Sequence, residues 1–195
     1  LFDFQKNIIK TGTITPSFGF NPDDGIKLGA AYTYTIKGFQ RNPFSQQHQF
    51  KGGYFFATNG FEFNYDGEIA NIYRDWNLQV SGRFTSENFT NNFFGYGNET
   101  VNNDDVLGLN YNRVKTGIYA VNVGVIKRGH WGSDFGFKAM FEGIEIEDTP
   151  NRYISGLNND FYKRRFFGGL QAQYQYKSFD NVLNPTRGMA FLLNV

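Results

Sequence analysis

The chain of 195 residues carries 19 Lys and Arg against 18 Asp and Glu, and this net charge of +1 removes the electrostatic reason to expect a nucleic-acid partner. It contains no cysteine, which excludes disulfides, thiolate zinc sites and cysteine nucleophiles, and its two histidines offer little for metal binding or acid–base catalysis. Aromatic residues make up 19% of the chain, and glycine contributes 23 residues, a composition unlike that of an ordinary soluble domain. We therefore expect neither catalysis nor a cofactor in this chain.

A transmembrane helix needs about 20 consecutive, mostly apolar residues, and Gly, Asn, Gln, Lys or Thr interrupts every apolar run well before that length. The mean hydropathy of -0.48 agrees. A transmembrane β-barrel, however, alternates lipid-facing with lumen-facing side chains, so its mean hydropathy is low as well. Mean hydropathy therefore does not separate a soluble protein from a transmembrane β-barrel, and the spacing of the apolar residues along the chain has to do so.

Apolar residues recur with the period of two that is typical of a β-strand with two different faces, as where Ile26, Leu28 and Tyr32 alternate with Lys27 and Gly29. In chain order, the predicted strands are residues 12–20, 26–37, 49–57, 61–66, 76–83, 107–112, 119–125, 135–147, 170–177 and 189–195. Most of these roughly ten strands approach the ~9–11 residues of a tilted transmembrane strand. The apolar phase shifts at Gly143, which predicts a β-bulge there.

The connections between these strands are of two kinds. Short ones at residues 21–25, 59–60 and 128–133 contain the Asn-Gly and Asp-Gly steps or the glycines of tight turns, and long ones fall at residues 37–47, 87–105 and 148–166. The two kinds are expected to alternate, with short turns at one end and long loops at the other. This is the pattern of a transmembrane β-barrel.

The two faces of such a barrel differ in chemistry. Large aromatics near strand ends, Tyr73, Trp76, Tyr119 and Trp131, fit aromatic girdles at the membrane interfaces. The candidates for the hydrated lumen are Lys27, Lys51, Arg83, Lys138, Glu142 and Lys177. These charges either set ion selectivity and line a transport path or pair with one another and only keep the interior wet. A soluble lipocalin-like barrel would instead place its apolar face inside.

Three further groups of residues have a functional and a structural interpretation. The paired acids Asp23-Asp24 and Asn103-Asp104-Asp105 offer oxygen ligands but are typical of solvated turns, so no metal is expected. His48 and His130 lack a nearby histidine, which favours loop or interface roles. The basic cluster of residues 163–165, flanked by aromatics, either contacts anionic lipid headgroups or ends a solvated loop.

Residues 178–189 read Ser-Phe-Asp-Asn-Val-Leu-Asn-Pro-Thr-Arg-Gly-Met, and within them Asn184, Pro185, Thr186, Arg187 and Gly188 form a tight turn signal. This stretch resembles the turn of the surface-antigen barrels in the BamA/TamA outer-membrane superfamily. Residues 21–25 and 92–100 are similar to segments of a bacterial branch that is often attached to a calcineurin-like metallophosphoesterase domain.

The resemblance implies a sixteen-stranded barrel in the outer membrane of a Gram-negative bacterium, with this chain as a single domain that supplies about the first ten strands. The family's later Val-Arg-Gly-Phe loop and its terminal insertion signal have no counterpart here, so the barrel is expected to be incomplete at its C-terminal side. The implied function is insertion or export of protein or lipid, or anchoring of a periplasmic domain, with membrane lipid and periplasmic or outer-membrane proteins as partners. A passive porin-like channel and a soluble lipocalin-like binder stay as alternatives.

Overall fold

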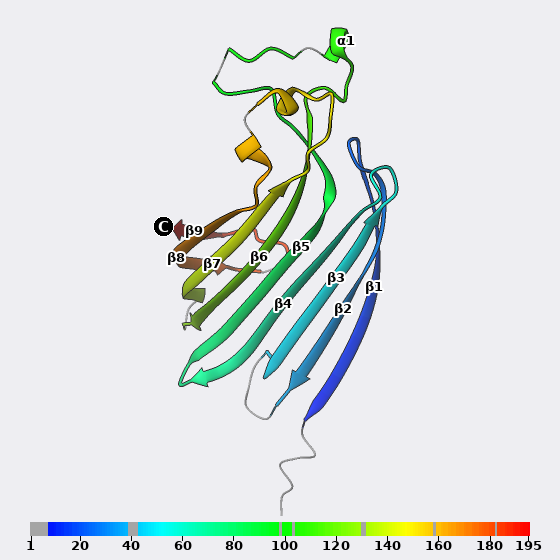
Figure 1. Ribbon diagram of the computed structural model, residues 1–195. Coiled ribbons are helices and arrows are strands. Elements are labelled where there is room, and N and C mark those ends of the chain that lie inside the picture. The colour runs from blue at the N-terminus through cyan, green and yellow to red at the C-terminus, as the bar shows by residue number, and fades with distance from the viewer. Residues whose placement is uncertain are drawn as a thin grey trace, which may run out of the picture.

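The computed structural model describes residues 8–38, 43–97, 99–102, 104–129, 132–157, 159–181 and 183–195. They form an all-β fold, one antiparallel sheet of nine strands in which every strand pairs with its neighbours in sequence (Figure 1). The strands are β1 (Ile9–Asn21), β2 (Gly25–Lys37), β3 (Gln46–Phe55), β4 (Gly60–Tyr73), β5 (Trp76–Asn92), β6 (Arg113–Arg128), β7 (Ser133–Ile146), β8 (Arg165–Phe179) and β9 (Gly188–Asn194). The helical turns are α1 (Asp104–Leu107), η3 (Tyr153–Gly156) and η4 (Asn159–Tyr162).

The strands pair in a register that brings the alternating apolar residues of neighbouring strands opposite one another. Ile26, Leu28 and Tyr32 on β2 are the partners of Phe20, Phe18 and Ile14 on β1, so apolar side chains meet on one face. Aromatic pairs continue this face across the sheet, with ring centroids 5.0 Å apart for Phe50 and Tyr65 and 4.9 Å apart for Phe84 and Tyr119. The alternation thus selects both the strands and the way they pair.

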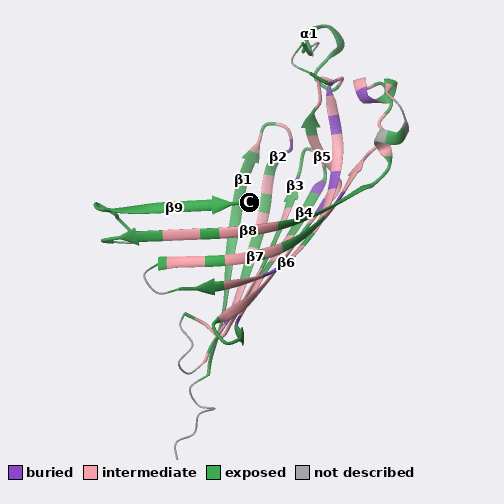
Figure 2. Cartoon of the chain, turned by 90° about the vertical axis from the view of Figure 1, so that its left-hand side faces the viewer, coloured by how far each residue is buried: buried purple, intermediate pink, exposed green. Residues whose placement is uncertain are grey.

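The sheet twists and curls along its length, and Figure 2 shows β7, β8 and β9 running across the direction of β1 and β2. The two outermost strands, β1 and β9, do not pair with each other, so the sheet is open within the described part of the chain. None of the helices in the described ranges is long and apolar enough to cross a membrane.

The predicted strand at residues 107–112 is wrong. Leu107 ends α1, and the backbone then turns, with Gly108 at φ +84° and hydrogen bonds from Tyr111 N to Gly108 O and from Arg113 N to Asn110 O. The alternation of this segment is short and rich in Gly and Asn, which favour turns. It belongs to the long connection 93–112, and the structure has nine strands rather than ten.

The predicted β-bulge at Gly143 is also wrong. Gly143 is in regular register with Tyr119 on β6 and with Phe166 on β8. The apolar phase changes because Ile144 and Ile146 lie on the opposite face from Phe141, where they meet apolar residues of the loops. The register shifts of the sheet lie elsewhere, between Ile69 and Tyr73 on β4 and between Thr85 and Phe89 on β5.

Short and long connections do not segregate to the two ends of the sheet. The long connections 93–112 and 147–164 share one end, beside α1 in Figure 1, with the short turns 22–24 and 56–59. The other end carries residues 38–45, 74–75, 129–132 and 180–187. Alternation fails because β4 and β5 are joined by the short turn Arg74-Asp75, at the same end of the sheet as the longer connection 38–45. The sequence does not mark this turn, since Arg74 at φ +50° stands where a glycine is typical. Of the aromatics predicted near strand ends, Tyr73 ends β4 and Trp76 begins β5, whereas Tyr119 lies inside β6; Trp131 lies outside the described residues.

The register between β5 and β6 predicts a specific cross-link. Ser81 and Asn122 are direct partners, and the Asn122 amide donates to the Ser81 hydroxyl over 3.1 Å. We expect the double variant Ser81→Cys with Asn122→Cys to form a disulfide on mild oxidation, because the Cα atoms of directly opposed residues are about 4.5–5.5 Å apart, within the ~4.4–6.8 Å found in disulfides. A loss of free thiols in this chain, whose 195 residues contain no other cysteine, measures it.

The matched control is Val80→Cys with Asn122→Cys, which moves one thiol by a single residue to the other face. Cross-linking in this control, or its absence in the first pair, would contradict the register.

Candidate functional site

One face of the sheet, here called the apolar face, carries large aliphatic and aromatic side chains that contact little else. Phe18 is 81% exposed and Phe137 is 48% exposed. Within the described residues, only Phe55, Ala70, Val114 and Ile154 are buried hydrophobics, and no large side chain is fully buried. Figure 2 shows exposed and intermediate residues along nearly all strands. The sheet therefore has no core of its own on this face.

The opposite face, here called the polar face, carries all six charged residues that the sequence singles out. Lys51 pairs with Asn64, Asn64 with Arg83, Arg83 with Ala120 and Ala120 with Glu142, which puts these residues in one row. By the same register, Lys27, Lys138 and Lys177 share that face: Lys27 is opposite Phe55, Lys138 is opposite Gly124 and Gln171, and Lys177 is opposite Ala190.

These charges are only partly paired. Lys27 forms an ion pair with Glu62 and stands over the Phe55 ring, 5.1 Å from its centroid. Lys51 lies 3.8 Å from Asp66, with both side chains about half exposed, so this pair contributes little. Arg83, Lys138, Glu142 and Lys177 have no ion-pair partner within 4.0 Å among the described residues.

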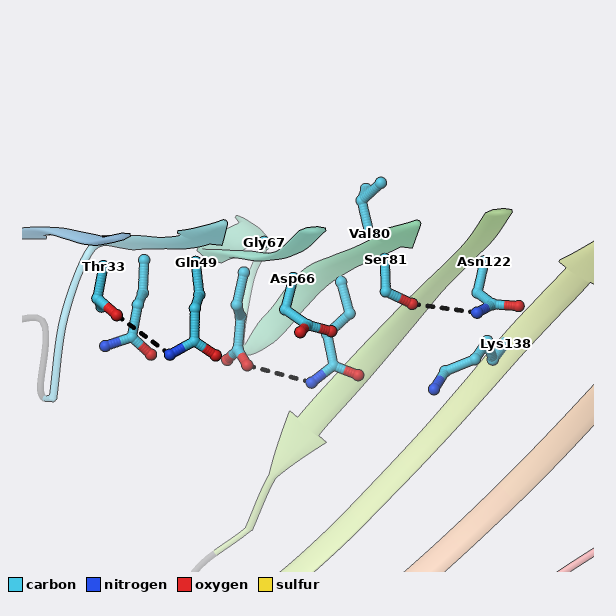
Figure 3. Close-up of a pocket in the computed structure, with 11 residues that line it drawn as sticks. Thr33, Gln49, Asp66, Gly67, Val80, Ser81, Asn122 and Lys138 are labelled. Carbon is cyan, nitrogen blue, oxygen red and sulfur yellow. Dashed lines mark hydrogen bonds between the residues drawn. The ribbon is translucent and has the colours of Figure 1, made fainter. Parts of the chain in front are cut away.

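The polar face is hollowed into a cavity of about 310 Å³. In Figure 3 the side chains of Gln49, Asp66, Asn122 and Lys138 point to the same side, and Val80 points away. The Gln49 amide donates to the Thr33 hydroxyl over 3.1 Å. Amides, hydroxyls and charges thus line this hollow, which suits water and polar solutes.

The densest network of the polar face surrounds Glu68. Its carboxylate accepts hydrogen bonds from Asn77 at 2.7 Å, from Gln79 at 3.1 Å and from Arg128 Nη2 at 2.8 Å. Glu68 is absent from the predicted lumen residues because the predicted strand ends at Asp66. Glu62 and Asp66 lie inside that predicted strand, but their pairing with Lys27 and Lys51 is visible only from the register of the sheet. The period-two series of polar residues continues to Glu68 on β4 and could have revealed it.

The turn motif after β8 is held by the Asp180 carboxylate. It accepts hydrogen bonds from the backbone N–H groups of Asn181, Thr186 and Arg187, each at 3.0 Å, and from the Thr186 hydroxyl. These donors hold the pKa of Asp180 at about 2, with the Thr186 hydroxyl as the largest cause.

The rest of the motif closes the same turn. Asn184 N donates to the Asn181 side chain over 3.2 Å, Pro185 follows, and Gly188 at φ +145° has no room for a Cβ beside the Ser178 carbonyl. Asn184, Pro185, Thr186, Arg187 and Gly188 are all exposed. The motif is therefore a structural turn in this chain.

The paired acids Asp23-Asp24 also brace a turn. Asp23 accepts from Arg113 over 2.8 Å, and Asp24 is only 4% exposed, with Asn21 Nδ2 at 2.7 Å and Thr90 N at 3.4 Å. Burial raises the pKa of Asp24. No group of three or more metal-ligating side chains occurs in the described ranges.

The other candidates of the sequence are also accounted for. His48 is hydrogen-bonded to the Tyr65 hydroxyl at 2.9 Å. His130, Asn103 and the side chain of Asp104 lie outside the described residues. In the basic cluster, Lys163 donates to Asp160 over 2.7 Å, Arg164 donates to Glu145 over 2.9 Å, and Arg165 donates to the Asp160 carbonyl over 3.5 Å.

Comparison of the chain with protein-family models, with curated proteins and with solved structures finds no match.

The Asp180 turn gives a prediction on protonation. The carboxyl carbon of Asp180 should titrate near pH 2 in an NMR titration, and Thr186→Val should move the midpoint up toward the ~3.9 of a free Asp, since the strongest donor is lost. Because the folded pKa is depressed, the turn's contribution to stability is present above pH ~4 and is lost as the pH falls toward 2. An unchanged midpoint in Thr186→Val would rule this network out; Asp160, held instead by Lys163, is the internal control.

Proposed function

We propose that this sheet is part of the wall of a transmembrane β-barrel in the outer membrane of a Gram-negative bacterium. The observation that carries the proposal is the division of the sheet into an apolar face of exposed aromatic and aliphatic side chains and a polar face of amides and charges. In a barrel, the apolar face would contact lipid and the polar face would contact the water of the lumen.

The free-energy cost of exposing apolar surface to water favours a sheet in a membrane over an open sheet in water. Contiguous apolar patches on soluble monomers seldom exceed about 300–600 Å², whereas the apolar face extends over all nine strands with side chains such as Ile14, Phe63, Val121, Phe137 and Leu193. Each Å² moved from water into lipid is worth about 25 cal/mol. Seven of the strands are 13 to 17 residues long, above the ~9–11 that cross a bilayer.

Closure is part of the proposal. Unpaired N–H and C=O groups along β1 and β9 are costly in lipid, so the barrel requires further strands that pair with both edges. A lipocalin-like binder has an apolar interior. The amide-lined hollow of about 310 Å³ on the polar face argues against that alternative.

Within the membrane, the role follows from the resemblance of residues 178–189, 21–25 and 92–100 to BamA/TamA-type barrels. We propose that the barrel takes part in insertion or export of protein or lipid, or anchors a periplasmic domain such as a metallophosphoesterase. Its partners are outer-membrane lipid and periplasmic or outer-membrane proteins. Any catalysis would belong to an attached domain.

Spin labels test which face meets lipid. In the full-length protein in bilayers, nitroxides on single cysteines at Val123 and Phe137 should collide more often with O₂, which concentrates in lipid, because these side chains are on the apolar face. Labels at Asn122 and Lys138, one residue away, should collide more often with a water-soluble nickel chelate.

Matched neighbours make the test sharp, since each pair shares depth and strand and differs only in face. Equal water accessibility at all four positions, or recovery of the protein in the soluble fraction, would end the membrane proposal. The reversed pattern would support an apolar interior and the lipocalin-like alternative.

A passive channel is the second candidate, favoured by the unequal pairing on the polar face. Lys37, Arg83, Lys138 and Lys177 are cations of this face without an ion-pair partner within 4.0 Å in the described part of the chain, against the two acids Asp134 and Glu142. A pore lined in this way has a positive interior and prefers anions.

Planar-bilayer recordings in a salt gradient check this candidate. The wild type should show a reversal potential on the anion-selective side, and Lys138→Glu should shift it toward cation selectivity, because two units of charge change at the hollow. Lys127→Glu, on the apolar face and 3.5 Å from Asp75, is the control and should leave the potential unchanged. No single-channel current, or identical potentials in all three proteins, would exclude a passive pore.

A further inference from the structure

The polar face ends in an apolar cavity of about 340 Å³ at the end of the sheet that carries the two long connections. Its walls include Val114, Ile144 and Ile146 from β6 and β7, Phe167 from β8 and Ile154 from η3. Register puts Val114, Ile144, Ile146 and Phe167 on the same face as Glu142 and Lys138. An apolar pocket on a face that carries mostly polar side chains is a local departure that the barrel wall does not require.

The two long connections hold the outer walls of this cavity in place. Tyr153 N donates to the Tyr111 carbonyl over 2.8 Å, and Arg152 Nη1 donates to the Arg113 carbonyl over 2.6 Å. Phe93 packs against Tyr153 with ring centroids 6.0 Å apart. Ile154 is 3% exposed and Val114 is 5% exposed, so the deep end of the cavity is built from well-packed side chains.

Two cations and two amides also line the cavity, together with Thr116, Phe93 and Tyr96. Lys163 and Arg165 from the basic cluster are exposed, and Asn91 and Asn92 come from the end of β5. Lys163 and Asp160, 2.7 Å apart, are both more than half exposed, so this pair is weak and leaves the ammonium available to a stronger anion. Arg164, between the two lining cations in sequence, is engaged by Glu145 and by the Tyr119 ring at 4.9 Å.

We propose that this cavity binds a single acyl chain that carries an anionic headgroup. The apolar walls would take the chain, and Lys163 and Arg165 would hold the carboxylate or phosphate through charge-assisted hydrogen bonds. The volume lies within the ~300–1,000 Å³ of ligand pockets, whereas packed cores leave few voids larger than a water molecule. The cavity is formed by residues of the polar face and of the two long connections, so this proposal does not use contact between the apolar face and lipid as a premise.

Photolabelling of the purified full-length protein tests the site. The probe is dodecanoic acid with a diazirine near its methyl end, and mass spectrometry locates the label. We expect label on the peptides that contain Ile144, Ile146 and Ile154, competed by decanoate. Competition should strengthen by about three- to fourfold for each methylene from octanoate upward until the chain fills the cavity.

Two variants separate the parts of the site. Lys163→Gln with Arg165→Gln, both exposed positions, should weaken competition by decanoate about tenfold and leave competition by methyl decanoate unchanged. Ile144→Phe should abolish specific label by filling the cavity. The matched control Arg164→Gln removes the intervening cation, which does not line the cavity, and should behave as the wild type.

A second competitor identifies the source of the headgroup. Stronger competition by decanoyl lysophosphatidate than by decanoate would indicate a membrane lipid, and the opposite order would indicate a free fatty acid. Label spread over the apolar face and insensitive to all variants would overturn the proposal, as would equal loss of label in Arg164→Gln and in the double variant. The spin-label pattern across Asn122 and Val123 is a separate observation, so the membrane proposal stands or fails independently.

Discussion

One antiparallel hydrogen-bonded ladder is the constraint on which the rest of this structure depends. Each strand pairs only with its sequence neighbours, and side chains alternate between faces except at two register shifts on β4 and β5, so a slip of one residue would exchange the apolar and polar faces. From β2 to β6 the row Ala31, Lys51, Asn64, Arg83 and Ala120 stays in one register. The charges gather on one face through pairing alone, without packing against a second layer.

The irregularities of the ladder occur where two ends of the sheet need different geometry. The shift between Ile69 and Tyr73 precedes the tight turn Arg74-Asp75, and the shift between Thr85 and Phe89 lies where β5 rises toward the long connections. Such irregularities bend a strand and increase its twist. They lie in the central strands, between the part of the sheet around β1 and the part around β9 that crosses it in Figure 2.

The all-β fold and most strands could be predicted because alternation is a local signal that pairing preserves. Where the alternation is short, as at residues 107–112, turn residues prevail, and Gly143 shows that a phase change can reflect a new environment rather than a bulge. The period of two predicts that the six charged residues from Lys27 to Lys177 share one face. It does not predict their partners, since Lys27 on β2 forms an ion pair with Glu62 on β4, across the intervening strand β3. Which loops cover Ile154 depends on contacts distant in sequence.

Most acids on the polar face form ion pairs with cations, and this pairing determines the sign of the net charge of the unpaired groups on that face. Glu62, Asp66 and Glu68 each lie beside a cation, Lys27, Lys51 and Arg128 respectively, so their charges are largely cancelled locally. Lys177, Lys138 and Arg83 are cations of this face without an ion-pair partner within 4.0 Å among the described residues, and the acids Asp134 and Glu142 lie on the same face. Glu142 is separated from Arg83 by Ala120. Because the unpaired cations of this face outnumber its unpaired acids, we expect the summed field of the face to attract anions. The same excess of cations supports both proposals, a preference for anions in the proposed lumen and an anionic headgroup at the apolar cavity.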